Sequence, residues 1–295
     1  MSAALPVIGD CEVHDIGSDI VGDTFRIFVG HCHDHATDGV STVYVTDANG
    51  AFGMTVDIVR HLQLGGHLPP MVVVGIGYPV ATLRDTIEKR TRDLTPTVSN
   101  VMFAADGSTM ATGGAAAFLR FVVDELMPWV SSRAPIGDDA SYIGHSLGGL
   151  FGAYTLFERP STFRGYAIAS PSIWWDDHQI RRREDEYAAA HDDLAATVVL
   201  TIGACETTDG RTRAAADVPE FARPALIAPA RDMVRDAESF VDALARRRYP
   251  SLRLRYRAIP DEHHVSVPPV ATSHSLRVLF GGPGARDLVP EVVLR

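Results

Sequence analysis

The sequence predicts an α/β fold in which a mostly parallel sheet is covered by helices on both faces. Short apolar runs alternate with helical patterns along the chain, which is the signature of this class. Runs such as Val72-Val73-Val74 and Val198-Val199-Leu200 are apolar throughout, as expected for strands buried on both faces. One helical pattern repeats its apolar side chains at the i, i+3, i+4 spacing of a one-faced helix: Phe118, Phe121, Val122, Leu126 and Val130.

The individual elements follow from these two patterns. Apolar, β-branched runs predict strands at Asp23–Val29, Ser41–Thr46, Met71–Gly75, Ser141–Ile143, Gly165–Ala169, Thr197–Ile202 and Leu252–Ile259. Helical periodicity predicts helices at Gly114–Trp129, Leu147–Phe157, Arg231–Arg247 and Val270–Phe280. We find neither internal repeats nor low-complexity linkers, so we expect residues 1–295 to form a single domain.

Two segments interrupt the alternation of strands and helices. Residues 79–111 are polar and loop-rich, and residues 207–229 are irregular, with three prolines spaced through them. Long ordered loops in compact domains are often lids or binding loops. Each segment is therefore a candidate lid, and a simple surface insertion is the alternative for each.

Composition and charge exclude several function classes. The net charge of −10 argues against nucleic-acid and anionic-membrane partners, since both reward a basic patch. No apolar run reaches the roughly 18 residues needed to span a bilayer, and the first residues lack the pattern of a secretion signal. The three cysteines lie far apart and form no CxxC pair, so a disulfide framework is not expected. We therefore expect a cytoplasmic protein.

The pentapeptide Gly144-His145-Ser146-Leu147-Gly148 is the main candidate for chemistry. It lies between a predicted strand and a predicted helix, the setting in which G-x-S-x-G forms a nucleophile elbow. Glycines on both sides allow a sharp turn that exposes the Ser146 hydroxyl. The bare pattern occurs by chance in a glycine-rich chain, but the strand–turn–helix context predicts a reactive serine.

A reactive serine needs a base and an acid that orients the base. The loop after the last predicted strand supplies two adjacent histidines, His263 and His264, as candidates for the base. For the acid, Glu206 lies at the end of the strand Thr197–Ile202 and is favoured by that position, with Asp209 as the alternative. The order Ser, acid, His is the one that an elbow serine requires in this fold class.

The chemistry also needs two backbone amides for the oxyanion of the tetrahedral intermediate. One is expected from Leu147, which follows the serine, and the other from the loop after the strand Ser41–Thr46, where Asn49 is the candidate. Asn49-Gly50 is also a strong turn signal, so a plain turn is the alternative for this loop.

Taken together, these residues resemble the putative esterase (esterase D-like) family of α/β-hydrolases, and most closely its ferric-siderophore esterase branch, which includes the enterobactin and bacillibactin esterases. The similar stretches follow one another in the family's order from about Asp23 to Phe280: Val43–Gly50, Val74–Pro79, Arg92–Pro96, Gly144–Phe151, Ser170–Trp175 and Glu262–Val267. The elbow combined with Ser170–Trp175 is the most specific part of the match. Two departures are Ala48, where many relatives have glycine, and the long 207–229 segment.

The resemblance implies an α/β-hydrolase fold and a metal-independent serine hydrolase of carboxylic esters without a cofactor. Ser146 corresponds to the nucleophile, His264 to the base, and Leu147 and Asn49 to the oxyanion donors, while Glu206 matches a glutamate that commonly follows the corresponding strand. The implied substrate is a small acyl ester or a siderophore-type trilactone. Acyl transfer to an alcohol or sugar is the alternative, and a non-catalytic binding module is the third hypothesis.

Further residues are candidates for binding the substrate. Trp174 and Trp175 follow a strand on the side where α/β sheets place ligands, although either could be a core or rim residue. Tyr78 and Arg92 lie in two of the similar stretches, and Arg90 and Arg92 could bind an anionic group or pair with local carboxylates. The His31-Cys32-His33-Asp34-His35 run suggests a metal cluster, but an exposed polar loop is the better interpretation and no metal site is expected. The oligomeric state stays open.

Overall fold

The computed structural model describes residues 9–33, 39–81, 85–100, 108–216 and 231–282, and its strands form one eight-stranded sheet with the order β1-β2-β4-β3-β5-β6-β7-β8. The strands are β1 Cys11–Ser18, β2 Asp23–Cys32, β3 Val40–Val45, β4 Met71–Gly77, β5 Ile136–His145, β6 Gly165–Ala169, β7 Thr197–Gly203 and β8 Arg253–Ile259. β2 pairs antiparallel with both β1 and β4, and every other neighbouring pair is parallel. The predicted fold class is confirmed.

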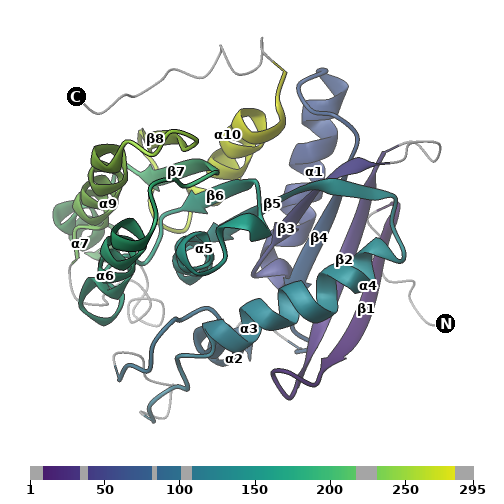
Figure 1. The fold of residues 1–295 in the computed structure, drawn as a ribbon, viewed down its shortest axis with the longest axis horizontal. Coiled ribbons are helices and arrows are strands. Elements are labelled where there is room, and N and C mark those ends of the chain that lie inside the picture. The colour runs from purple at the N-terminus through teal and green to yellow at the C-terminus, as the bar shows by residue number, and fades with distance from the viewer. Residues whose placement is uncertain (1–8, 34–38, 82–84, 101–107, 217–230, 283–295) are drawn as a thin grey trace.

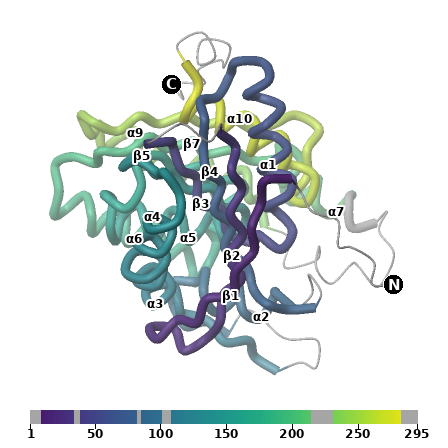
Figure 2. The backbone as a smooth tube through the Cα atoms, turned by 90° about the vertical axis from the view of Figure 1, so that its right-hand side faces the viewer, coloured from purple at the N-terminus to yellow at the C-terminus, as the bar shows by residue number. Residues whose placement is uncertain are grey.

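Helices cover both faces of the sheet (Figures 1 and 2). The α-helices are α1 Ala48–Leu64, α2 Thr86–Asp93, α3 Ala115–Arg120, α4 Met127–Ser131, α5 Leu147–Glu158, α6 Trp175–Ala190, α7 Thr208–Ala216, α9 Met233–Arg247 and α10 Pro268–Phe280. A π-helical turn, Phe121–Leu126, joins α3 to α4, and a 3-10 turn lies at Pro160–Thr162. α1 and α10 pack against each other on one face, while α3, α4, α5, α6 and α9 lie on the other.

The core follows this layering. The larger apolar cluster fills the α5 side of the sheet and includes Phe118, Phe151 and Trp175. A second cluster lies beneath α1 and α10, where Phe52 and Val56 pack with side chains of the strands. Since both faces are covered, β4 is buried along its whole length and β7 from its second residue on, which is why their sequences read as continuous apolar runs.

The structure contains elements that the sequence patterns did not predict. β1 is a half-exposed edge strand with little apolar content, and β5 begins at Ile136, earlier than the predicted Ser141. Helices α1, α2, α6 and α7 were also missed. α2 occupies part of the 79–111 segment and α7 the start of the 207–229 segment, whereas residues 101–107 and 217–230 lie outside the described residues, so both candidate lids stay predictions.

The parallel strands place their connections at one edge of the sheet. The turns after β3, β5, β7 and β8 lead into α1, α5, α7 and the loop before α10, and all leave the carboxyl ends of the strands. This edge therefore gathers residues that are far apart in sequence. Among the described helices, none is both long enough and apolar enough to cross a membrane.

Candidate active site

Ser146 lies at the turn between β5 and α5 in a backbone conformation that is rare for any residue except glycine. Its φ is 61° and its ψ is −116°. A Cβ on Gly144 would lie 2.3 Å from the Gly148 carbonyl oxygen, and one on Gly148 would lie 2.6 Å from Thr46 Oγ1. Both contacts are impossible, so the close packing of this turn requires glycine at both positions.

Hydrogen bonds from neighbouring turns hold Ser146 in this strained conformation. Its N–H donates to the Ala169 carbonyl at 3.0 Å, and its own carbonyl accepts from the N–H groups of Leu150 (3.0 Å) and Ser172 (3.1 Å). Such a backbone conformation costs on the order of 1–3 kcal/mol and persists only where several surrounding contacts hold it in place. The predicted strand–turn–helix elbow is present.

The serine hydroxyl, a histidine and a buried carboxylate form a continuous hydrogen-bonded series. Ser146 Oγ lies 3.0 Å from Nε2 of His264, which follows β8 in the loop before α10. Nδ1 of His264 lies 2.6 Å from Oε2 of Glu206. The Glu206 side chain is fully buried between β7 and α7. The structure thus brings together three residues that are separated by as many as 118 positions.

The second oxygen of Glu206 is also fully engaged. Oε1 accepts from the Ser170 hydroxyl at 2.5 Å and from the Gly203 N–H at 2.9 Å. Burial by itself would raise the pKa of Glu206, but the hydrogen bond and charge of His264, together with the Ser170 and Gly203 donors, outweigh it and hold the pKa below its usual value. An ionised carboxylate only accepts hydrogen bonds, so Nδ1 of His264 carries the proton and Nε2 is free to accept from Ser146.

The two alternatives left open by the sequence are placed differently. Asp209 is exposed at the start of α7, three residues beyond the buried carboxylate. His263 caps a turn, in which its carbonyl accepts from the N–H groups of Ser266 and Val267. In the described residues, the hydrogen bonds to Ser146 and Glu206 belong to the neighbouring His264.

The stretch expected to be an oxyanion loop is the first turn of a helix. α1 begins at Ala48, and the preceding Asp47 has a φ of 58° and accepts from the N–H groups of Gly50 and Ala51. Asn49 is the second residue of the helix, so its N–H has no acceptor within the helix. Its side chain is clamped to Tyr78 by two 2.8 Å hydrogen bonds, one to the carbonyl and one from the N–H.

Leu147 has the equivalent place at the start of α5. As the first residue of that helix, it also has an N–H without an intrahelical acceptor. Helix N-termini carry a partial positive charge that stabilises anions. The departure at Ala48 is harmless in this setting, because this residue is a buried first position of a helix and has no need for glycine's conformations.

An ion pair whose carboxylate partner the sequence did not identify holds the turn before α1. Arg90 of α2 donates from Nε (2.6 Å) and Nη2 (2.9 Å) to the two carboxylate oxygens of Asp47. Beside it, the Thr46 hydroxyl lies 2.9 Å from the Tyr142 hydroxyl, which donates to the Gly148 carbonyl at 2.8 Å. These contacts connect the two helix N-termini rigidly. Of the two alternatives for Arg90, an anionic ligand or a local carboxylate, the structure shows the pairing with a carboxylate.

Comparison with known proteins is consistent with this geometry. A family model described as "Putative esterase" matches residues 40–246. The chain belongs to this esterase family. The siderophore enterobactin esterase of Emericella nidulans is 33% identical over 251 residues, which are 79% of this chain and 80% of the relative. The ferri-bacillibactin esterase BesA of Bacillus subtilis is 28% identical over 275 residues, 90% and 88% of the two chains.

A solved structure shows the same architecture. The BES protein from Bacillus cereus superposes with a TM-score of 0.77 at 25% identity, covering 96% of this chain and all of that one. The family resemblance stated from the sequence motifs is therefore confirmed, and the protein is a carboxylic ester hydrolase.

Two of the predicted substrate-binding residues of the esterase are core residues. Trp175 is 0% exposed, and its indole N–H donates to the Thr97 hydroxyl at 3.0 Å. Tyr78 is 3% exposed, and its hydroxyl donates to Asp93 at 3.0 Å. Substrate contact by these two side chains does not fit their burial. The alternative interpretation, that one of the two tryptophans is a core residue, applies to Trp175.

The other two predicted binding residues keep some exposure but have partners within the protein. Arg92 makes two hydrogen bonds with Asp93 (2.6 and 2.9 Å) and one with Asp23 (2.9 Å). Trp174 is partly exposed, and the guanidinium of Arg231 lies 4.1 Å from the centroid of one of its rings. Of the four, only Trp174 stays a plausible surface for substrate.

The histidine-rich run of the esterase is not the exposed loop that we expected. His31 and Cys32 belong to the end of β2, and Cys32 is 4% exposed. His31 lies 3.3 Å from Glu12, while Asp34 and His35 lie outside the described residues. Within the described ranges, no cluster of three or more His, Cys, Asp or Glu side chains could hold a metal ion. The absence of a metal site stays a prediction, and Cys11, Cys32 and Cys205 are free thiols.

Proposed function

We propose that this esterase cleaves its substrate through a covalent acyl-enzyme formed on Ser146. The observation that carries the proposal is the 3.0 Å and 2.6 Å hydrogen-bonded series from Ser146 through His264 to Glu206. His264 takes the hydroxyl proton through Nε2 as Ser146 attacks the ester carbonyl. The same nitrogen then returns the proton to the departing alcohol, and a water molecule activated in the same way releases the acid.

The charge that develops in each step has a matching group in this arrangement. When His264 becomes positively charged, the buried carboxylate of Glu206 lies next to its Nδ1 and stabilises the imidazolium. When the carbonyl oxygen becomes negative, the N–H groups of Leu147 and Asn49 are the proposed donors. One such donor contributes roughly 3 kcal/mol to transition-state stabilisation. The Arg90–Asp47 pair, 2.6 Å long, supports this role by fixing the turn that carries Asn49.

We propose the ester bonds of a siderophore as the substrate. Support comes from the names of two relatives that match most of both chains, an enterobactin esterase and a ferri-bacillibactin esterase. The net charge of −10 makes a nucleic acid a poor partner, in line with a small-molecule ester. A small acyl ester is the competing substrate. A cytoplasmic location is part of the proposal, and cell fractionation tests it.

One experiment tests the nucleophile and the substrate together. Wild type, Ser146→Ala and the exposed-serine control Ser132→Ala are compared on a p-nitrophenyl ester and on a ferric catecholate trilactone, and each is treated with a fluorophosphonate probe. We expect labelling and hydrolysis by wild type and Ser132→Ala, and neither by Ser146→Ala. Unchanged hydrolysis by Ser146→Ala would refute the mechanism. Activity restricted to short acyl esters would refute only the siderophore substrate.

A further inference from the structure

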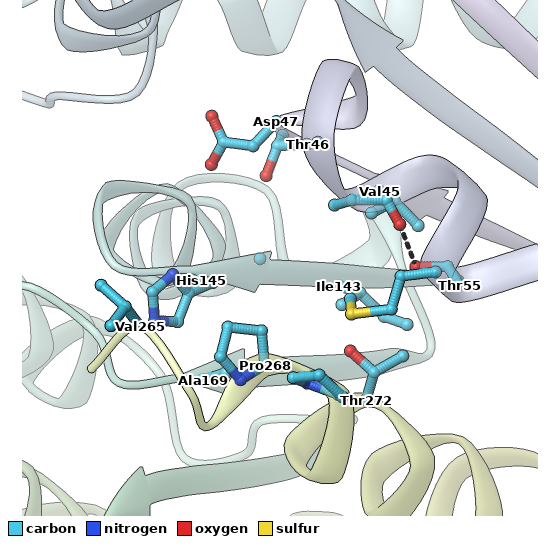
Figure 3. Close-up of a pocket in the computed structure, with 15 residues that line it drawn as sticks. Val45, Thr46, Asp47, Thr55, Ile143, His145, Ala169, Val265, Pro268 and Thr272 are labelled. Atoms are coloured by element: carbon cyan, nitrogen blue, oxygen red, sulfur yellow. Dashed lines mark hydrogen bonds between the residues drawn. The ribbon is translucent and has the colours of Figure 1, made fainter. Parts of the chain in front are cut away.

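A pocket of about 330 Å³ lies beside the candidate active site, on the sheet face covered by α1 and α10 (Figure 3). Its floor is formed by the ends of β3 and β5, and its walls by the first turns of α1 and α10. Its volume is at the lower end of the range of small-molecule sites, which is about 300–1,000 Å³. Ser146 itself is not part of the lining, but its chain neighbour His145 and Val265, the neighbour of His264, both are.

The pocket is apolar apart from a few polar groups, and most of these already have partners. Val45, Ile143, Met54 and Pro268 supply apolar surface. The Thr55 hydroxyl donates to the Ala51 carbonyl at 2.9 Å, and the Asp47 carboxylate is paired with Arg90. The pocket therefore suits an uncharged ligand, because the one charged group in its lining is already neutralised.

His145 is the exception among the polar groups of the lining. Its Nε2 is buried and has no hydrogen-bond partner within the part of the chain that the structure describes. Burial first, and then the neighbouring charge of His264, lower the pKa of His145 to about 3, so the ring is neutral at working pH. A buried polar atom without a partner is costly, and a ligand that supplies the missing hydrogen bond recovers that loss. One oxygen on the ligand, opposite this nitrogen, would do so.

The position of the pocket indicates which half of an ester it receives. The rings of His145 and His264 are 4.5 Å apart between centroids, and Val265 continues the chain from His264 into the pocket lining. The base must return its proton to the leaving oxygen, so the alcohol half of the ester departs next to His264. The pocket is an apolar space on that side, since His145 and Val265 both belong to its lining.

We propose that this pocket binds a small uncharged alcohol, with its carbon chain against Met54 and Pro268 and an oxygen paired with His145 Nε2. The proposal rests on the proposed acyl-enzyme mechanism at Ser146 and names the alcohol half for the competing substrate class, a small ester. The same chemistry has two sources, namely the alcohol half of the ester before cleavage and a free alcohol that accepts the acyl group.

Two isomeric esters separate the alcohol side from the acyl side. Butyl acetate and methyl pentanoate have the same composition, but the four-carbon chain lies on the alcohol in the first and on the acyl group in the second. With methyl acetate as reference, we expect wild type to favour butyl acetate in kcat/KM by on the order of ten- to fifty-fold, from three further buried methylenes. Met54→Trp, which fills the pocket, should reduce this preference to about two-fold.

The control is Leu64→Trp, the same substitution at the exposed far end of α1, where the side chain is 87% exposed. It should keep the wild-type preference. A Met54→Trp effect on methyl pentanoate instead of butyl acetate would overturn the assignment, as would equal effects on both isomers. No preference for butyl acetate in wild type would also overturn it.

A binding measurement keeps the pocket testable if no ester is cleaved. In that case the proposed function fails, and titration of benzyl alcohol into wild type, Met54→Trp and His145→Phe tests the pocket alone. We expect binding to wild type that weakens at least ten-fold in both variants; equal binding to all three would refute the pocket. In an active enzyme, benzyl acetate formed from p-nitrophenyl acetate and benzyl alcohol identifies the free alcohol as a ligand, and inhibition without transfer identifies the alcohol half.

Discussion

Replacing Glu206 with glutamine tests whether the orientation of His264 depends on the buried carboxylate. The substitution keeps the size of the side chain and exchanges one oxygen for an NH2 group. In wild type, Oε1 accepts from the Ser170 hydroxyl and the Gly203 N–H, and Oε2 lies against His264. The NH2 group of the new amide therefore faces either Ser170 and Gly203 or His264.

The Gly203 N–H decides this choice. The Ser170 hydroxyl can rotate so that it accepts a hydrogen bond, but a backbone N–H only donates. An NH2 group facing Gly203 would therefore place two hydrogen-bond donors against each other in a fully buried site. The lost buried hydrogen bond of the Gly203 N–H costs about 1–3 kcal/mol. The amide oxygen therefore stays with Gly203, and the NH2 group faces His264.

The consequence is the wrong tautomer of the base. Nδ1 of His264 must then accept a hydrogen bond, which places the ring proton on Nε2, where it points at Ser146 and cannot receive the hydroxyl proton. The productive orientation is the minor one, so we expect kcat for a p-nitrophenyl ester to fall by about 10²–10⁴, with a smaller change in KM. The rate of fluorophosphonate labelling should fall in parallel.

Two matched variants show whether the reasoning is right. Asp209→Asn changes the exposed carboxylate at the start of α7 and should keep wild-type kcat. Ser170→Ala removes one of the two donors to Oε1 and should reduce kcat by about ten-fold or less. Retention of more than a tenth of kcat in a folded Glu206→Gln variant would refute the tautomer argument. A loss in Asp209→Asn as large as in Glu206→Gln would refute the choice of acid.

Three further predictions concern the surroundings of the site. Arg90→Lys removes the two-pronged contact with Asp47 and should lower kcat about ten-fold with little change in KM, as steady-state kinetics would show; a purely KM effect would contradict a positioning role. Gly148→Ala forces a Cβ to 2.6 Å from Thr46 Oγ1 and should lower both kcat and the melting temperature, so an unaltered melting curve would contradict it. Burial, with the charges of Arg257 and Arg277, lowers the pKa of His274 to about 4. Below about pH 6.5, His274 therefore binds a proton in the unfolded state but not in the folded state. The free energy of unfolding falls by up to about 1.4 kcal/mol per pH unit between pH 6.5 and pH 4. Urea unfolding at pH 7 and pH 5 should show a smaller difference for His274→Gln than for wild type.

The sequence was most informative where a polar residue lies within a few positions after a predicted strand. Ser146, Glu206 and His264 lie just beyond β5, β7 and β8, and parallel strands bring such positions to one edge. The order of the residues along the chain then limited the possible roles. Which of two neighbours faces the serine depends on the exact course of each turn, and this was settled for His264 only by the family resemblance.

The missed features all depend on contacts between distant segments. α1 contains Asn49, Gly50 and Gly53, residues that favour turns, and its helical state follows from the burial of Phe52 and Val56 against the sheet. That apolar spacing was a usable signal, but the turn signal of Asn49-Gly50 outweighed it. The Arg90–Asp47 pair joins residues 43 positions apart, and no local pattern indicates such a contact.

The polar groups around His264 differ in a way that local sequence cannot reveal. On one side of its ring, the Glu206 carboxylate has every oxygen engaged by donors, which makes the acid side of the site rigid and closed. On the other side, His145 Nε2 is buried and has no hydrogen-bond partner among the described residues, next to an apolar pocket. This unpartnered nitrogen lies beside the base that returns its proton to the leaving alcohol. That asymmetry favours ligand binding on the His145 side over a purely structural role for the residue, and it predicts that His145→Phe weakens alcohol binding far more than it changes the melting temperature.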